Sequence, residues 1–130
     1  MSMNDTLAAV LSHINNYEQK NKPEVLTKYS SKIIKKVLDL LQRENYIAGY
    51  EEIEDSKGNL LRIYLNGNIN RVGAIKPRFA VKATEYEKFE KRYLPAKGFG
   101  ILIVSTVKGL MTHYEAKQQG LGGRLIAYCY

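Results

Sequence analysis

The sequence predicts an α+β fold in which two parts meet near residue 66. In some segments apolar residues recur at helical spacing, and in others they alternate with polar residues, which is the pattern of a mixed chain. The charge balance shifts at the same place. Residues 1–65 carry nine basic and nine acidic side chains, whereas residues 66–130 carry eleven basic and four acidic ones. We therefore expect an N-terminal α+β subdomain at 1–66 and a basic C-terminal subdomain at 67–130.

Two amphipathic helices are predicted in the first part. Apolar residues at i, i+3, i+4 and i+7 indicate a helix over residues 5–17, which Asn4 or Asp5 can cap. A second helix is expected after a cap at Ser30 or Ser31. Five aliphatic residues would form its buried face: Ile33, Ile34, Val37, Leu38 and Leu41.

Strands separate and follow these helices. Val25 and Leu26 suit a short strand. Residues 46–54 and 61–65 are expected to pair as a hairpin, because residues 55–58 form a turn in which Gly58 supplies the unusual dihedral angles. The first part therefore has the predicted order α-β-α-β-β.

The second part begins with a basic segment without an acid between residues 66 and 84, which Pro77 makes irregular or places at a sheet edge. Thr84 and Glu87 have the spacing of a capping box, and so do Thr112 and Glu115. Each would begin a short helix, the second ending at Gly120. Buried strands are expected at 99–104 and 124–130, which makes this part mostly antiparallel β-sheet with short helices.

Composition excludes several classes of protein. The longest purely apolar run is residues 101–104, which is too short to span a bilayer, and the start lacks the pattern of a secretory signal. A single cysteine, Cys129, excludes an internal disulfide framework and suggests a reducing compartment. We therefore expect a cytoplasmic protein without a membrane partner.

Catalytic and metal sites are not indicated. Ser105 and His113 form the one nucleophile–base pair within a segment, but no nucleophile elbow surrounds the serine. A loop serine and an exposed helical histidine are the favoured interpretation. The acids of the second part fall at expected capping or surface positions, and His13, His113 and Cys129 lack ligand spacing. We expect no enzyme, no cofactor, no metal and no small-molecule substrate.

The net charge of +7 and the pI near 9.4 point to an anionic partner. Nucleic acid is the common one, and a basic surface that serves solubility is the alternative. The segment 105–109 follows the most apolar strand and precedes a capped helix, so its hydroxyls and amides can bind phosphates, sugars or base edges. An ordinary strand–helix connection explains it equally well.

Residues 120–123, Gly-Leu-Gly-Gly, do not form a nucleotide-binding loop, because the Lys-Ser/Thr ending is absent. Two interpretations stay open for these glycines. They are a helix stop with a turn, or they let the backbone approach another backbone or an RNA sugar closely.

Three stretches together resemble a known family. Residues 101–112 (ILIVSTVKGLMT), Glu115-Ala116 and residues 120–128 (GLGGRLIAY) closely resemble the signature of the eighth protein of the small ribosomal subunit. The start, 4–8 with 14–16, is similar to the family's first helix. The middle, 73–79 and 86–95, is similar to its archaeal form. The resemblance covers essentially the whole chain.

The resemblance implies a non-catalytic protein of two small α+β subdomains packed together. Such a protein binds the central domain of small-subunit ribosomal RNA, helps to organise its assembly and touches neighbouring small-subunit ribosomal proteins. Bacterial members also bind a messenger RNA that mimics this site, so translational autoregulation is the alternative function.

The resemblance also implies which residues bind RNA. The main loop falls on Ser105, Thr106, Val107, Lys108 and Gly109. Contacts around the next helix and the glycine turn fall on Thr112, Glu115, Gly122 and Gly123. Secondary contacts fall on Asn4, Asp5, Thr6, Asn15, Lys28, Ser30, Ser31 and Lys32.

Two positions depart from the bacterial pattern. Val107 stands where bacteria have serine, so that side chain cannot donate a hydrogen bond here. The backbone, or an apolar contact with a base or ribose, would replace it. Arg124 stands where bacteria usually have glutamate, and it adds a positive charge that could meet a phosphate or an internal partner.

Overall fold

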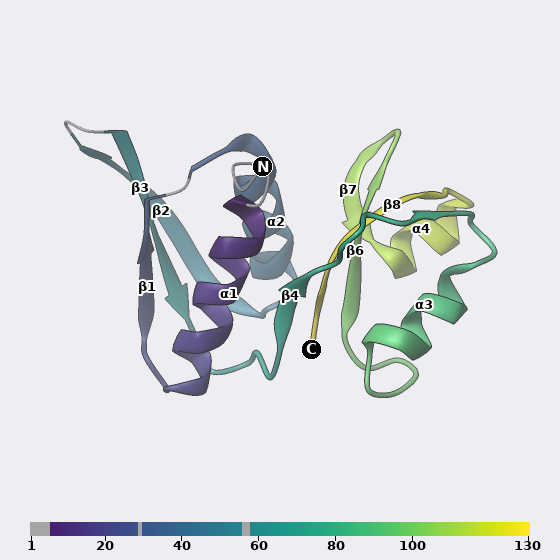
Figure 1. Ribbon diagram of the computed structural model, residues 1–130, viewed down its shortest axis with the longest axis horizontal. Coiled ribbons are helices and arrows are strands. Elements are labelled where there is room, and N and C mark those ends of the chain that lie inside the picture. Colours follow the sequence, from purple (N-terminus) through teal and green to yellow (C-terminus); the bar gives the residue numbers. More distant parts are fainter. Residues whose placement is uncertain (1–5, 29, 56–57) are drawn as a thin grey trace. The chain divides into compact units, whose positions relative to one another are not determined.

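The computed structural model describes residues 6–28, 30–55 and 58–130 (Figure 1) and divides into two compact units, Met1–Val72 and Gly73–Tyr130. The segment after residue 65 belongs to the first unit by its hydrogen bonds. Asn68 Nδ2 donates to the carbonyl oxygen of Asn45 (2.8 Å), and the amide of Val72 donates to Asn15 Oδ1 (3.1 Å). The structure therefore changes unit a few residues after the change in charge.

The first unit is a three-stranded antiparallel sheet with two helices on one face (Figure 1). The strand order is β1-β3-β2. Its elements are α1 (Thr6–Gln19), β1 (Glu24–Thr27), α2 (Lys32–Arg43), β2 (Ile47–Asp55) and β3 (Gly58–Leu65). The predicted order α-β-α-β-β is confirmed.

Alternation along β3 explains why one face of this sheet is covered. Leu61, Ile63 and Leu65 are buried, whereas the residues between them are partly exposed. The apolar stripe of α1 packs on the buried face as the helical spacing predicts. In α2, Ser31 is the cap and its Oγ accepts from the amide of Ile34 (3.4 Å). Leu40 is buried, whereas the predicted Ile33 is only partly buried.

The second unit contains a five-stranded sheet whose order is β4-β8-β6-β7, with β5 paired to β8. Its elements are β4 (Val72–Ala74, which begins at the unit boundary), β5 (Ala80–Val81), α3 (Tyr86–Tyr93), β6 (Ile101–Thr106), β7 (Gly109–Thr112), α4 (His113–Gln119) and β8 (Gly123–Cys129). The strand predicted at 99–104 begins two residues later than expected.

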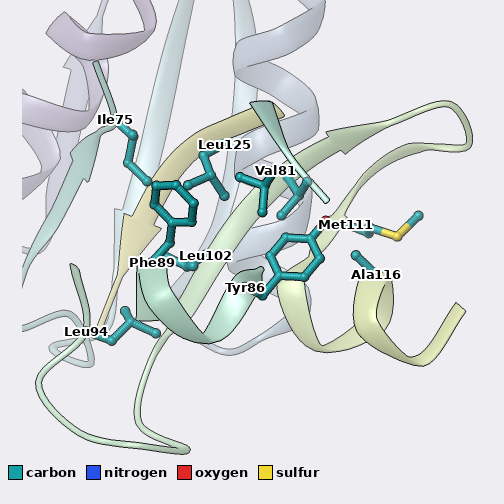
Figure 2. Close-up of a cluster of buried hydrophobic side chains, with 10 residues drawn as sticks. Ile75, Val81, Tyr86, Phe89, Leu94, Leu102, Met111, Ala116 and Leu125 are labelled. Atoms are coloured by element: carbon teal, nitrogen blue, oxygen red, sulfur yellow. The ribbon is translucent and has the colours of Figure 1, made fainter. Parts of the chain in front are cut away.

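The core of this unit lies between the sheet and its helices α3 and α4 (Figure 2). Tyr86 is fully buried, and its hydroxyl donates to the carbonyl oxygen of Leu121 (2.9 Å). Its neighbours in the cluster come from strands and helices alike: Ile75, Val81, Phe89, Leu94, Leu102, Val104, Met111, Ala116 and Leu125. This arrangement buries both the ring and its polar atom without leaving a polar atom unpaired.

One of the two predicted capping boxes is wrong. Glu85, not Thr84, is the cap of α3, and no side chain bonds there to the helix amides. The carboxylate of Glu85 instead accepts from the amide of Lys82 (2.9 Å). Burial of Tyr86 at the first helical residue decides where α3 begins, and that contact is invisible in the local sequence.

The second capping box is confirmed. Thr112 Oγ1 accepts from the amide of Glu115 (3.2 Å), and the Glu115 carboxylate accepts from the amide of Thr112 (3.0 Å). Gly120 ends α4 with a left-handed backbone (φ +68°). None of the described helices is long and apolar enough to cross a membrane.

Candidate nucleic-acid interface

The segment 105–109 is a hairpin and not the strand–helix connection that the sequence suggested. Ser105 pairs with Leu110 and Thr106 with Gly109, so the turn consists of Val107 and Lys108 alone. Strand β7 was missed because it has four residues and becomes a strand only by pairing with β6. The helix α4 then follows β7 directly.

The Thr106 hydroxyl holds this turn in place. Its Oγ1 donates to the carbonyl oxygen of Gly109 (2.9 Å) and accepts from the amide of Lys108 (3.1 Å). The side chains of Ser105 and Lys108 are exposed, and Val107 is 94% exposed. The tip therefore presents a hydroxyl, an isopropyl group and an ammonium from a backbone that is fixed by internal hydrogen bonds.

The strand behind the tip is rigidly anchored. The four residues Ile101, Leu102, Ile103 and Val104 are each at most 3% exposed. Strand β6 also pairs on both edges, with β7 and with β8. Side chains at the end of such a strand keep their geometry better than those on an isolated loop.

Cross-strand pairing brings Arg124 beside the tip. Arg124 pairs with Ser105 on β6 and with Ala80 on β5, so these residues lie in one row across the sheet. The guanidinium is exposed, and its Nη1 donates to the carbonyl oxygen of Arg78 (3.3 Å). Arg124 therefore meets an internal carbonyl group and leaves further donors facing solvent.

The glycine turn packs backbone against backbone. A Cβ on Gly122 would lie 2.5 Å from the carbonyl oxygen of Val81, and a Cβ on Gly123 would overlap the carbonyl oxygen of Ser105. Both interpretations from the sequence contribute, since Gly120 stops the helix and the next glycines allow close approach. The approached backbone belongs to the chain itself.

The remaining predicted residues of this unit are used internally. Thr112 is 2% exposed and Glu115 is partly buried, and both belong to the capping box of α4. Their side chains orient the helix that follows the hairpin. A contact of either with RNA stays a prediction.

The secondary residues of the first unit divide into three groups. Lys28, Ser30, Ser31 and Lys32 line one hollow of about 520 Å³ at the start of α2, together with Lys35, Glu52, Gly58 and Asn59. Thr6 begins α1, and Asn15 binds the amide of Val72. Asn4 and Asp5 lie outside the described residues.

The hollow is basic, but it also contains one carboxylate, Glu52, whose negative charge is paired with Lys35. Glu52 accepts from Lys35 Nζ (2.8 Å), from Ser30 Oγ (2.8 Å) and from Asn59 Nδ2 (2.8 Å). The hydrogen bond from Lys35 is the main reason that the pKa of Glu52 falls to about 2. Lys28 and Lys32 remain exposed at its rim.

The family model of ribosomal protein S8 matches residues 5–130. The chain belongs to the ribosomal protein S8 family. This family is one of small-subunit ribosomal proteins, which are structural and bind ribosomal RNA. The resemblance found in the sequence is thereby confirmed.

Membership of the ribosomal protein S8 family fits the distribution of charge in the structure. The second unit carries ten basic and four acidic side chains. Three of these acids have internal partners: Glu85 binds a backbone amide, Glu90 pairs with Lys117, and Glu115 closes the capping box. The basic residues at the surface therefore face few competing carboxylates.

The predicted position of His113 is wrong. It is fully buried, not exposed, and its Nδ1 accepts from the backbone amide of Leu102 (3.0 Å). Glu90, expected on the surface, is 8% exposed. Its carboxylate pairs with Lys117 Nζ (2.5 Å) and lies 3.7 Å from His113 Nε2.

This arrangement is structural. Burial lowers the pKa of His113 to about 4, and the approach of Glu90 only partly offsets that effect. A neutral imidazole has one nitrogen that can accept a proton, and in His113 that nitrogen, Nδ1, already accepts from the Leu102 amide. His113 therefore cannot serve as a base for the exposed Ser105. In the described residues, no three metal-ligating side chains gather either.

Sequence reasoning missed His113 and Glu90 because their signals are non-local. His113 follows the capping threonine, a position that is usually solvated, and Glu90 lies on a short helix with many charges. Only the packing of α3 against α4 puts the two residues together. The one available signal was the spacing of Glu90 with Tyr86 and Phe89, which places it near the buried side of α3.

Proposed function

We propose that this protein binds the central domain of small-subunit ribosomal RNA directly in the cytoplasm and helps to organise its assembly, with the β6–β7 tip as its principal contact. The observation that carries the proposal is the tip itself. Val107 is 94% exposed in the turn after β6, a strand whose first four residues are buried. Ser105 and Lys108 are exposed beside it, so the turn offers a hydroxyl, an apolar group and a cation together, which suits a contact with RNA sugars, bases and phosphates.

The chemistry of the tip suits an irregular RNA helix. Regular A-form RNA hides its base edges in a deep, narrow major groove, so a protein recognises distorted segments. Ser105 can donate to and accept from a base or ribose. Val107 offers an apolar contact, and Lys108 and Arg124 provide charge for phosphates on either side.

The basic hollow of the first unit supplies a second contact in this proposal. Lys28 and Lys32 would meet phosphates, while Ser31 is committed to capping α2. Phosphate contacts fix orientation without reading sequence. The tip would therefore provide the specificity, and the hollow would provide part of the affinity.

The deciding experiment measures binding of the purified protein to a central-domain RNA hairpin and to a scrambled hairpin of equal length, across a salt series. We expect a large preference for the cognate hairpin that persists at moderate salt. Equal affinity for the two hairpins, lost at moderate salt, would mean that only the net charge drives binding, and the proposal would be wrong.

Replacement of Lys108 tests the electrostatic part of the tip. Lys108→Ala should weaken binding to both hairpins and lower the salt slope by about one. Lys97→Ala is the matched control, because Lys97 is an exposed lysine of the same unit outside the proposed contact. If both variants lower the salt slope equally, Lys108 contributes no more to RNA binding than another exposed lysine, and the charge of the tip is not part of a specific contact.

Replacement of Thr106 tests the geometric part. Thr106→Ala removes both hydrogen bonds that hold the turn. The difference in affinity between the cognate and the scrambled hairpin should therefore become smaller, while the dependence of affinity on salt stays unchanged. Thr106→Ser keeps the hydroxyl and should restore the difference. The pair of isotherms decides, because failure of serine to rescue would show that the hydroxyl does not act through the turn.

A further inference from the structure

The sheet of the first unit has a second face that no described element of this unit covers (Figure 1). Helices α1 and α2 both pack on the opposite side. We call this surface the outer sheet face, and seven residues form it: Glu24, Leu26, Glu51, Ile53, Leu60, Arg62 and Tyr64.

Strand register shows that these side chains share one face. Leu26 and Glu51 both pair with Arg62, Ile53 pairs with Leu60, and Glu24 pairs with Tyr64. Directly paired residues of antiparallel strands point to the same side of a sheet. Their sequence neighbours on the other side, such as Val25 and Ile63, are at most 1% exposed.

One corner of the outer sheet face is apolar. Leu26 is 52% exposed, and Leu60 and Ile53 beside it are partly exposed. Leu26 and Leu60 also line a hollow of about 460 Å³, together with Thr27, Lys28 and His13. A hollow beside exposed leucines gives an incoming apolar side chain a place to pack.

The centre of the face is acidic. Arg62 Nε lies 3.2 Å from Glu24 Oε2, and Arg62 Nη1 lies 3.5 Å from Glu51 Oε1. The Tyr64 hydroxyl donates to the same Glu51 oxygen (2.5 Å). Two carboxylates surround one guanidinium, so this face is negative in a protein whose net charge is +7.

We propose that the outer sheet face binds a basic protein neighbour in the small subunit. The apolar corner would take an aliphatic or aromatic side chain, and Glu24 and Glu51 would pair with lysine or arginine of that neighbour. The inference rests on the proposed function only in placing the protein on ribosomal RNA, where its neighbours are found.

Charge complementarity selects this occupant. RNA phosphates are repelled by the two carboxylates. Proteins that share an RNA scaffold carry excess positive charge, as this chain does, and would repel one another without an acidic surface between them. The acids of the outer sheet face provide such a surface.

Photo-crosslinking in assembled small subunits tests the proposal. p-Benzoylphenylalanine is placed at the position of Leu26 in one protein and at that of Val107 in another. We expect the probe at Leu26 to form an adduct that protease removes and ribonuclease does not. An adduct of that probe with RNA and with no protein, an adduct with a second copy of this chain, or no adduct at all would overturn the inference.

The Val107 probe separates this inference from the proposed function. That probe should form an adduct with ribosomal RNA. If it fails while the Leu26 probe captures a basic ribosomal protein, the tip assignment is wrong and the outer sheet face stands. The reverse result would leave the tip in place and remove the docking surface.

Charge reversal tests the chemistry of the contact. Glu24→Lys combined with Glu51→Lys should lower the yield of the protein adduct about tenfold. Glu44→Lys is the control, since Glu44 is an exposed acid outside the outer sheet face. Leu26→Ser, without a probe at that position, should lower the amount of the identified neighbour in the particle. Equal losses in Glu44→Lys would contradict a specific acidic contact.

Discussion

Gly123→Ala is expected to destabilise the second unit by about 3 kcal/mol, because the added methyl group has no space. Its Cβ would overlap the carbonyl oxygen of Ser105 and lie 3.0 Å from Val104 Cγ1. Strands β6 and β8 would have to move apart exactly where the tip begins. Urea denaturation, followed with hydrogen exchange of the β6 and β8 amides, measures the loss.

Gly49→Ala is the matched control in a strand of the other unit. A Cβ there meets only the side chain of Gln42, at an ordinary distance of 3.6 Å or more. We expect a change within about 0.5 kcal/mol. The explanation would be wrong if both variants were equally stable, since close approach would then not be the reason for glycine at 123.

The same substitution should also weaken recognition of RNA. Gly123 begins β8 and lies against the carbonyl oxygen of Ser105, next to the Ser105–Arg124 pair, so its replacement shifts Ser105 and Arg124 relative to each other. The preference for the cognate hairpin should fall at temperatures where the variant remains folded. A folded Gly123→Ala protein with unchanged preference would separate the glycine turn from the interface.

His113→Phe is expected to cost about 1–3 kcal/mol at pH 7, because it removes the acceptor of the buried Leu102 amide. Phenylalanine fills most of the volume of the imidazole, so the loss reports the hydrogen bond more than a cavity. The Leu102 amide should exchange faster with solvent in the variant. His13→Phe is the control, since His13 is exposed.

The effect of His113 should depend on pH in a defined direction. Its pKa is lowered from 6.5 to about 4 in the folded protein. Between these two pH values the imidazole is therefore protonated in the unfolded chain and neutral in the folded one. The difference in unfolding free energy between wild type and His113→Phe is therefore largest above pH 6.5. As the pH falls from 6.5 to about 4, this difference should decrease by about 3 kcal/mol, so that the variant becomes at least as stable as wild type.

A pair of pH titrations of the unfolding free energy measures this difference. The carboxylates titrate in both wild type and His113→Phe, so their contribution to the pH dependence of the unfolding free energy cancels in the difference. A difference that stays constant from pH 7 to pH 4 would contradict a buried neutral imidazole.

Local signals in the sequence predicted much of the fold. The apolar stripes of α1 and α2, the β2–β3 hairpin and the box formed by Thr112 and Glu115 depend on residues within one or two turns of each other. Each of them forms as expected. The family signature at 101–128 likewise lies within one continuous stretch, and the family is confirmed over residues 5–130.

Features that depend on partners distant in the chain were missed or misjudged. Thr84 is not the cap of α3, because burial of Tyr86, whose hydroxyl bonds to Leu121, decides that the helix starts after Glu85. Burial of His113 and Glu90 requires α3 and α4 to meet. In each case a tertiary contact outweighs the weak local preference.

The candidate interface divides in the same way. The sequence by itself determined which residue types follow the apolar strand 101–104, that the second part is basic, and to which family the chain belongs. Only the tertiary structure decided that the Thr106 hydroxyl bonds within the hairpin turn, that Val107 is exposed, and that Arg124 lies beside Ser105. The physical reason is that exposure and free hydrogen-bonding capacity are what remain after packing, and packing joins residues that the chain keeps far apart.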